Sequence, residues 1–306
     1  MSEPLYIIDT DPGLDDAHAI AMAVAALSPH QLVITTVAGN APLDAVTDNA
    51  TWLVDELAPA VPVYRGAAGP LVGPPVDAVH IHGRDGMGGY PHGPGEVTPR
   101  PQPAALAIVE LARARSGPVH IIALGPLTNL ALAVALEPDL PTMLASVTIM
   151  GGSPAQHGNA SLNAEYNIFA DPYAAETVFA LFRDVTLLTW DASLAHRFSR
   201  EEMEQFWAGD SDAAALLRAV DAHRLATDPV YAAGADFGRP DPLAMAVVTH
   251  PETVTSAVAH RIRVVHDGGL AHGVTVVDER DVLTDRAPVR IIETFDRASL
   301  LAALRV

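Results

Sequence analysis

Cysteine and lysine are both absent from this chain of 306 residues. The lack of cysteine excludes a disulfide framework, a thiolate metal site and a cysteine nucleophile. The lack of lysine excludes a Gly-Lys-Ser/Thr phosphate loop, a Schiff base and ammonium-dependent phosphate chemistry. Every basic side chain is therefore an arginine or a histidine, and several enzyme classes are excluded before any motif is considered.

Long hydrophobic runs and a basic surplus are missing as well. The longest apolar stretch, around residues 17–27, includes His18 and is far shorter than the roughly 20 residues that cross a bilayer. The chain begins Met-Ser-Glu-Pro-Leu, without the pattern of a secretory leader. The formal net charge of −19 argues against DNA or RNA as a partner and is compatible with cations and small neutral substrates. We expect a cytoplasmic protein with no membrane and no nucleic-acid polymer as partner.

Short β-branched runs alternate with helical patterns through most of the chain. The apolar spacing between Ala17 and Leu27 fits one face of a helix. Such alternation favours a mostly parallel sheet with helices on both faces. Strands are predicted at residues 5–9, 32–38, 119–123, 146–150 and 185–190. No linker divides the chain, so we predict a single α/β domain over residues 1–306.

The pattern changes after about residue 255. Two short apolar runs at residues 262–266 and 274–277 flank a segment that contains Asp267-Gly268-Gly269. They predict an antiparallel hairpin at an edge of the sheet. A strand at residues 289–292 and a helix that begins at Arg297 are expected to follow.

Four aspartates fall within residues 9–16, around a Pro-Gly turn that follows the first predicted strand. Ligands of open α/β sheets bind outside the carboxyl ends of the strands. Carboxylates at this density repel one another, and burial raises the cost. A divalent cation relieves this cost, and the all-oxygen donor set indicates Ca²⁺ or Mg²⁺. The alternative is capping of the next helix by Asp15 and Asp16, which explains only one or two of the four carboxylates.

Other polar residues near predicted strand ends have both a functional and a structural interpretation. Asn40 suits a left-handed turn, Thr128 suits a helix N-cap, and Asp241 suits the N-cap of an apolar helix. A run of amides and a carboxylate suits either hydrogen bonding to several hydroxyl groups or a solvated loop. That run consists of Asn159, Asn163, Glu165 and Asn167.

Residues 66–103 are rich in glycine and proline and are too many for an ordinary connection. Loops of this length are often lids or binding loops. His82 lies in this segment, next to Gly83 and shortly before three further glycines. A histidine in such a loop is a better candidate for ligand binding than a core histidine.

Taken together and in order, these segments resemble the inosine–uridine-type nucleoside hydrolase family, and the resemblance spans essentially the whole chain. The string of residues 9–17, Asp-Thr-Asp-Pro-Gly-Leu-Asp-Asp-Ala, is its most specific part. The supporting motifs are Val37-Ala38-Gly39-Asn40, His82-Gly83, Gly125-Pro126-Leu127-Thr128-Asn129, Met150-Gly151-Gly152, Asn159, Glu165-Tyr166-Asn167, Asp171-Pro172 and Asp241-Pro242-Leu243-Ala244. The resemblance implies a Rossmann-like α/β domain that assembles as a homodimer or homotetramer and cleaves ribonucleosides to ribose and free base.

The same resemblance implies roles for individual residues. One Ca²⁺ ion would be held by the carboxylates of Asp11, Asp16 and Asp241 and by the main-chain carbonyl of Thr128. Asp11 would act as general base for a calcium-bound water. The substrate-binding residues would be Asp15, Asn40, Met150, Asn159, Glu165, Asn167 and Asp241. Positive charge builds on the ribose as the N-glycosidic bond breaks, so anionic surroundings suit this chemistry.

One position departs from the family pattern. Many broad-specificity members have a histidine before the last aspartate, where it protonates the leaving base. This chain has Pro240 there, and proline cannot donate a proton. The resemblance therefore predicts an intact metal and ribose site with altered base preference. His82 is predicted to take the leaving-group role, His223 and Tyr231 are further candidates, and Phe237 could stack on the base.

Three other functions stay open at this stage. Asp9-Thr10-Asp11 also resembles the start of haloacid-dehalogenase-type phosphatases, but Gly13 departs from that pattern and lysine is absent. A binding protein for ribose or nucleosides could retain the substrate-binding residues without turnover. A related N-riboside, such as nicotinamide riboside, could be the substrate of a hydrolase.

Overall fold

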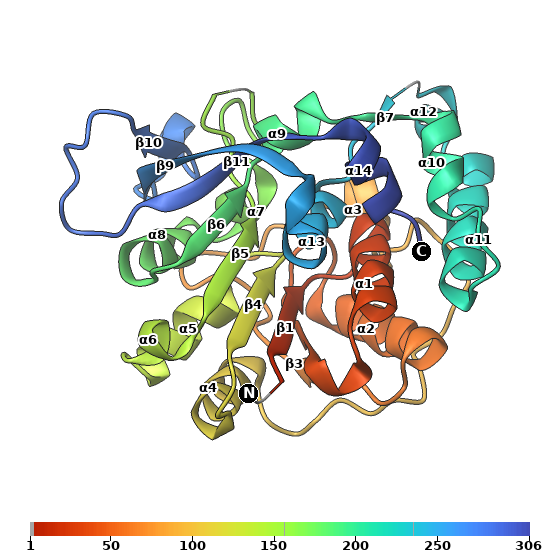
Figure 1. Cartoon of the computed structure of the whole chain (residues 1–306), viewed down its shortest axis with the longest axis horizontal. Helices are drawn as coiled ribbons and strands as arrows, with labels where there is room; N and C mark the ends of the chain where they lie inside the picture. Colours follow the sequence, from red (N-terminus) through yellow and green to blue (C-terminus); the bar gives the residue numbers. More distant parts are fainter. Residues whose placement is uncertain (1–2, 156, 235) are drawn as a thin grey trace.

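A nine-stranded sheet runs through the described part of the chain in the order β10-β9-β11-β6-β5-β4-β1-β2-β3 (Figure 1). The computed structural model describes residues 3–155, 157–234 and 236–306. Neighbouring strands from β11 to β3 are all parallel, whereas β9 is antiparallel to β11 and to β10. The strands are β1 Leu5–Thr10, β2 Leu32–Thr36, β3 Val63–Arg65, β4 Val119–Ala123, β5 Ser146–Met150, β6 Val185–Leu188, β9 Val254–Val264, β10 Thr275–Asp278 and β11 Val289–Phe295.

Helices cover both faces of the sheet, and each face has its own apolar core. One face is covered by α1 Leu14–Ala26, α2 Leu43–Leu57, α9 Trp190–Ala195, α10 Arg200–Phe206, α11 Asp212–Thr227, α12 Pro229–Ala233, α13 Pro240–Thr249 and α14 Arg297–Ala303. The other is covered by α4 Ala104–Ala114, α5 Thr128–Leu136, α6 Leu140–Met143, α7 Tyr166–Ala170 and α8 Pro172–Leu181. The predicted α/β architecture with a mostly parallel sheet is confirmed.

Successive side chains of each strand enter opposite cores because a strand has a period of two residues. Ile7 packs on the α4–α8 side and Ile8 on the α1–α13 side. Ile121 and Ile122 divide in the same way one strand further along. This two-sided burial explains why the central strands are continuous apolar runs rather than alternating ones.

The strand order places the site. β2 and β3 lie on one side of β1, and β4, β5 and β6 lie on the other, so the connections leave in opposite directions between β1 and β4. Such a switch point creates a crevice outside the carboxyl ends of the strands. The residues after β1, β2, β4 and β5 therefore meet at one edge of the sheet.

Most predicted elements are present, with differences at their ends. The strand predicted at residues 185–190 ends at Leu188, because Thr189 caps the helix α9 and its side chain accepts a hydrogen bond from the Ala192 amide. The strand predicted at residues 32–38 ends at Thr36. The strand β3 was not predicted, because three residues are too few to produce a periodic pattern.

The predicted antiparallel edge is confirmed as the pair β9–β10. Its turn uses Gly268 at φ +85° and Gly269 at φ +75°, where side chains with a Cβ are strained. β9 begins at Val254, earlier than predicted, because its first half also pairs with β11. The predicted final helix is α14.

Residues 66–103 are largely irregular and contain one short helix, α3 Val79–His82. A second small sheet pairs β7 Phe198–Ser199 with β8 Asp236–Phe237. The chain between β7 and β8 forms α10, α11 and α12. These helices lie on the side of the molecule away from β9 and β10 (Figure 1).

No helix within the described residues is both long enough and apolar enough to span a bilayer.

Candidate active site

A cavity of about 480 Å³ lies at the switch point of the sheet. This volume suits a small-molecule ligand. Eight of the residues predicted from the sequence line it: Asp15, Asn40, His82, Met150, Asn159, Glu165, Asn167 and Asp241. They come from segments far apart in the chain, which the fold brings together at one edge of the sheet.

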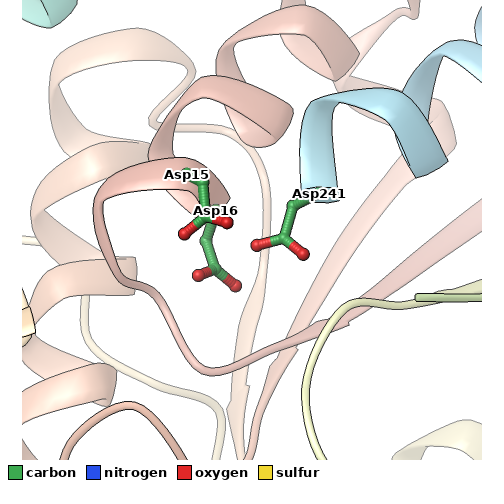
Figure 2. A group of neighbouring side chains, drawn as sticks. All are labelled: Asp15, Asp16 and Asp241. Atoms are coloured by element: carbon green, nitrogen blue, oxygen red, sulfur yellow. The ribbon is translucent and has the colours of Figure 1, made fainter. Parts of the chain in front are cut away.

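Three carboxylates meet beside this cavity. Asp15, Asp16 and Asp241 each offer one oxygen, and these oxygens all lie within 4.8 Å of one another. Asp15 and Asp16 come from the first turn of α1 and Asp241 from the first turn of α13, and the carboxyl group of Asp241 points toward the other two (Figure 2). The two helices pack against each other, which places both positively polarised N-termini at the cluster.

Asp16 is both a capping residue and a member of this cluster. Its Oδ2 accepts a hydrogen bond from the Gly13 amide at 2.9 Å, and its Oδ1 accepts one from the Thr10 hydroxyl at 2.5 Å. Asn40 Nδ2 donates to Oδ2 at 3.1 Å. Burial and the charge of Asp15 nevertheless raise the pKa of Asp16 to about 6. Capping therefore accounts for part of its environment and leaves its charge incompletely compensated.

Asp11 is fully buried beneath the cavity. Its Oδ2 accepts a hydrogen bond from the Asn40 amide at 2.7 Å, while Oδ1 has no partner among the described residues. Burial, followed by the charge of Asp16, raises its pKa well above the ordinary value. A Cβ at Gly39 would lie 2.0 Å from Oδ2, and one at Gly125 would lie 2.6 Å from Oδ1. Only glycine at these two positions leaves room for the carboxylate.

Asp241 completes the acidic group. Burial, with the charges of Asp15 and Asp16, raises its pKa well above the ordinary value. A buried set of carboxylates that repel one another, with an unpartnered oxygen on Asp11, matches the all-oxygen site that a hard divalent cation takes. These residues therefore fit a metal ion.

Asp9, the first aspartate of the string, has a structural role in hydrogen bonding between elements. Its Oδ1 accepts hydrogen bonds from the Thr35 hydroxyl at 2.5 Å and from Asn129 Nδ2 at 2.7 Å. It is fully buried and does not line the cavity, and burial raises its pKa to about 6. Asp9 thus joins β1, β2 and α5 below the site.

Two predicted substrate-binding residues at the start of α7, Glu165 and Asn167, are held by main-chain contacts. Glu165 caps α7 by accepting from the amides of Asn167 at 3.0 Å and Ile168 at 3.3 Å, and it also accepts from Gly152 at 2.9 Å. Asn167 Nδ2 donates to the carbonyl oxygens of Leu124 at 2.6 Å and Met150 at 3.1 Å. Burial raises the pKa of Glu165 to about 6. Both side chains therefore reach the cavity in fixed orientations.

Thr128 is not brought to the cavity. It is the first residue of α5, and its hydroxyl donates to Asp171 Oδ2 at 2.7 Å. Thr128 is not among the residues that line the cavity, and the predicted role of its main-chain carbonyl as a metal ligand stays a prediction. Leu124, directly after β4, lines the cavity, and its main-chain oxygen accepts from Asn167. The sequence patterns did not indicate a role for Leu124.

His82 closes one side of the cavity. Its Nδ1 is buried without a partner among the described residues, and it would lie 2.5 Å from a Cβ at Gly13. Burial lowers its pKa, so the ring is neutral near pH 7. Asn49 holds this loop to the aspartate string, because its Nδ2 donates to the carbonyl oxygens of Pro12 at 2.8 Å and Asp85 at 2.7 Å.

Sequence reasoning missed several residues of the cavity. Tyr166 lies inside a recognised motif, and its hydroxyl is 2.6 Å from the Gly39 carbonyl oxygen and 3.0 Å from that of Val76. Arg224 lies in α11 without any motif that marks it. Of the two further leaving-group candidates, Tyr231 lines the cavity and His223 does not. Phe237, predicted to stack on the base, also lines it.

Comparison with known proteins identifies the family. Residues 6–302 match the inosine-uridine preferring nucleoside hydrolase family, so this chain belongs to it, as its motifs predicted. The non-specific ribonucleoside hydrolase RihC of Escherichia coli O139:H28 (strain E24377A / ETEC) is 44% identical over 179 residues, 58% of each chain. RihC of Shigella dysenteriae serotype 1 (strain Sd197) gives the same values. These matches span less than two thirds of the curated relatives.

Solved structures of similar proteins match nearly the whole length of this chain. A plant nucleoside hydrolase, the PpNRh1 enzyme, has a TM-score of 0.87 at 28% identity and covers 98% of this chain and 97% of its own. An inosine-guanosine nucleoside hydrolase has a TM-score of 0.88 at 26% identity and covers 99% and 98%. The fold of this family is therefore shared along the full sheet.

Proposed function

We propose that this chain hydrolyses the N-glycosidic bond of ribonucleosides and releases ribose and the free base. The observation that carries the proposal is the buried carboxylate of Asp11, whose Oδ1 has no partner among the described residues, beside a cavity lined by acidic and amide side chains. Family membership and the names of the relatives support it. The phosphatase alternative has no comparable support.

The cofactor that we propose is Ca²⁺, held by Asp11, Asp16 and Asp241. When bound, such a cation would lower the pKa of water and orient the ribose diol. Ca²⁺ is favoured over Mg²⁺ if main-chain carbonyls join the carboxylates, because Ca²⁺ accepts more ligands in a more flexible geometry. Thr128 does not line the cavity, and the role of its main-chain carbonyl as a further ligand stays a prediction.

In the proposed reaction Asp11 removes a proton from the attacking water. Asp15, Asn40, Asn159, Glu165 and Asn167 bind the ribose hydroxyls from the lining of the cavity. Their fixed orientation favours the flattened, positively charged ring of the transition state over the ground state. Met150 contributes its side chain to the same wall.

His82 remains the residue that we propose on the leaving-group side. We expect His82→Ala to lower kcat on inosine and uridine by about 10- to 100-fold, because a positioned acid or hydrogen-bond donor is lost. Initial rates over a range of substrate concentrations measure it. His92→Ala, in the same long loop but outside the cavity lining, is the control. Rates that His82→Ala leaves unchanged would refute the assignment.

The function itself is tested by a reducing-sugar assay with purine, pyrimidine and nicotinamide ribosides. We expect release of ribose from at least one nucleoside, and saturable binding measured by calorimetry at the same concentrations. Binding without any ribose release would instead favour the binding-protein alternative. Turnover of nicotinamide riboside alone would redirect the proposal to that substrate.

The predicted single domain, the homodimeric or homotetrameric assembly and the cytoplasmic location remain predictions. A role in nucleoside salvage or catabolism would follow from the proposed activity.

A further inference from the structure

One wall of the cavity differs in charge from the rest. Arg224 from α11, Tyr231 from α12 and Phe237 from β8 line it, together with Arg239. The strand ends contribute carboxylates and amides instead. A nucleoside has a polar ribose and a flat aromatic base, so the wall with aromatic rings suits the base.

Arg224 is held in a defined orientation on this wall. Its guanidinium carbon lies 4.1 Å from the centroid of the Tyr231 ring, and its Nε lies 3.6 Å from Asp228 Oδ2. The side chain is 20% exposed. Among the described residues its two terminal NH₂ groups have no hydrogen-bond partner. Stacking on Tyr231 and pairing through Nε therefore leave the outer edge of the guanidinium available.

The polar groups of Tyr231 and Arg239 on this wall are occupied, and Asp236, from the same strand as Phe237, also lines the cavity. The Tyr231 hydroxyl donates to Asp221 Oδ1 at 2.5 Å. Arg239 Nη2 donates to the Tyr231 hydroxyl oxygen at 3.3 Å, and its Nε contacts the sulfur of Met203 at 3.3 Å. Tyr231 thus presents a ring and no free hydroxyl proton. Pro240 has no donor at all.

We propose that Arg224 is a catalytic residue that stabilises the departing base, and that it selects 6-oxopurine ribonucleosides. The inference rests on the proposed function. Arginine binds O6 and N7 of a 6-oxopurine with two parallel N–H bonds, whereas adenine presents an amino group at position 6. The 6-amino group of adenosine would therefore face the N–H groups of Arg224, and two hydrogen-bond donors cannot pair with each other.

The chemical step balances with the groups named. The C1′–N9 bond breaks and its electron pair passes to the base, where the negative charge spreads to N7 and O6. The water oxygen bonds to C1′, and its proton passes to Asp11. The guanidinium donates hydrogen bonds to the charge that develops, and solvent later protonates the base. Arginine keeps its charge in proteins, so it serves as an electrostatic donor and not as an acid.

The test compares two leaving groups in the full-length enzyme. Inosine needs help for its base to depart, whereas 4-nitrophenyl riboside releases a stable anion unaided. We expect Arg224→Gln to lower kcat on inosine by about 100-fold or more and to change kcat on 4-nitrophenyl riboside by less than about 3-fold. Arg224→Lys should recover part of the loss, because charge returns without the paired donors. We also expect the wild type to prefer inosine to adenosine, and Arg224→Gln to reduce that preference.

Arg200→Gln is the matched control. Arg200 also stacks on Tyr231 and Phe237, at 5.3 Å and 4.5 Å, but it does not line the cavity. It should leave both rates within about 3-fold, since no contact with the base is lost. An equal loss on both substrates in Arg224→Gln would show that Arg224 only shapes the site, and equal wild-type rates on inosine and adenosine would overturn the selectivity. A wild type that cleaves neither riboside would refute the proposed function itself.

Discussion

Replacement of Asp11 by alanine or asparagine is expected to abolish turnover, with kcat lowered by about 1,000-fold or more. General-base catalysis alone contributes about 100- to 10,000-fold. Asp11 is buried and positioned by the Asn40 amide, and its Oδ1 has no hydrogen-bond partner in the part of the chain that the structure describes. An asparagine keeps the shape and hydrogen-bonding capacity of the side chain but cannot accept the proton. Steady-state kinetics on a nucleoside that the wild type cleaves measures the effect.

Asp9→Asn is the matched control for this prediction. Asp9 is a buried aspartate of the same string, but its Oδ1 accepts from Thr35 and Asn129. Burial and the charge of Asp16 raise the pKa of Asp11, whereas the pKa of Asp9 is raised by burial alone. We expect the control to lower stability by about 1–3 kcal/mol and to keep kcat of the folded enzyme within a few-fold. If Asp11→Ala retained a tenth of the wild-type rate, the assignment of Asp11 as general base would be wrong.

Removal of the divalent cation is the second change with a large expected effect. Dialysis against a chelator should lower activity by at least about 100-fold, and Ca²⁺ should restore it, because a bound cation would lower the pKa of water and orient the ribose diol. Metal analysis by mass spectrometry should find one ion per chain before dialysis. Full activity in a preparation without bound divalent cation would exclude the proposed cofactor. Mg²⁺ in place of Ca²⁺ tests which ion the site prefers.

The same cation should stabilise the fold in a pH-dependent way. In the chain alone, the pKa of Asp16 rises from its ordinary value of 3.8 to about 6, mainly because of burial. Its contribution to stability is therefore present below pH 3.8 and is lost as the pH rises through about 6. A cation reverses this loss by binding the ionised carboxylates. Ca²⁺ should thus raise Tm strongly at pH 7.5 and little at pH 4, and Asp16→Asn should remove most of that gain.

Local sequence patterns predicted most of the strands of the large sheet. Ile7 and Ile121 enter one core and Ile8 and Ile122 the other, as successive residues of a strand do. These strands were predicted from their short runs of β-branched residues. The short strand β3 and the pair β7–β8 produce no such pattern, because their pairing partners come from elsewhere in the chain. Strand ends were misplaced where a capping residue such as Thr189 ended the strand early.

The candidate site also has features that the sequence predicts and features that only the tertiary structure shows. The aspartate string, the Glu165–Asn167 motif and the exclusion of lysine and thiol chemistry follow from the sequence by itself, because each is encoded by neighbouring residues or by an absence. Only the tertiary structure decided that Asp241 meets Asp15 and Asp16 within 4.8 Å, that Thr128 does not line the cavity, and that Arg224 does. These are contacts across long stretches of chain, and they depend on how strand order and helix packing orient each side chain.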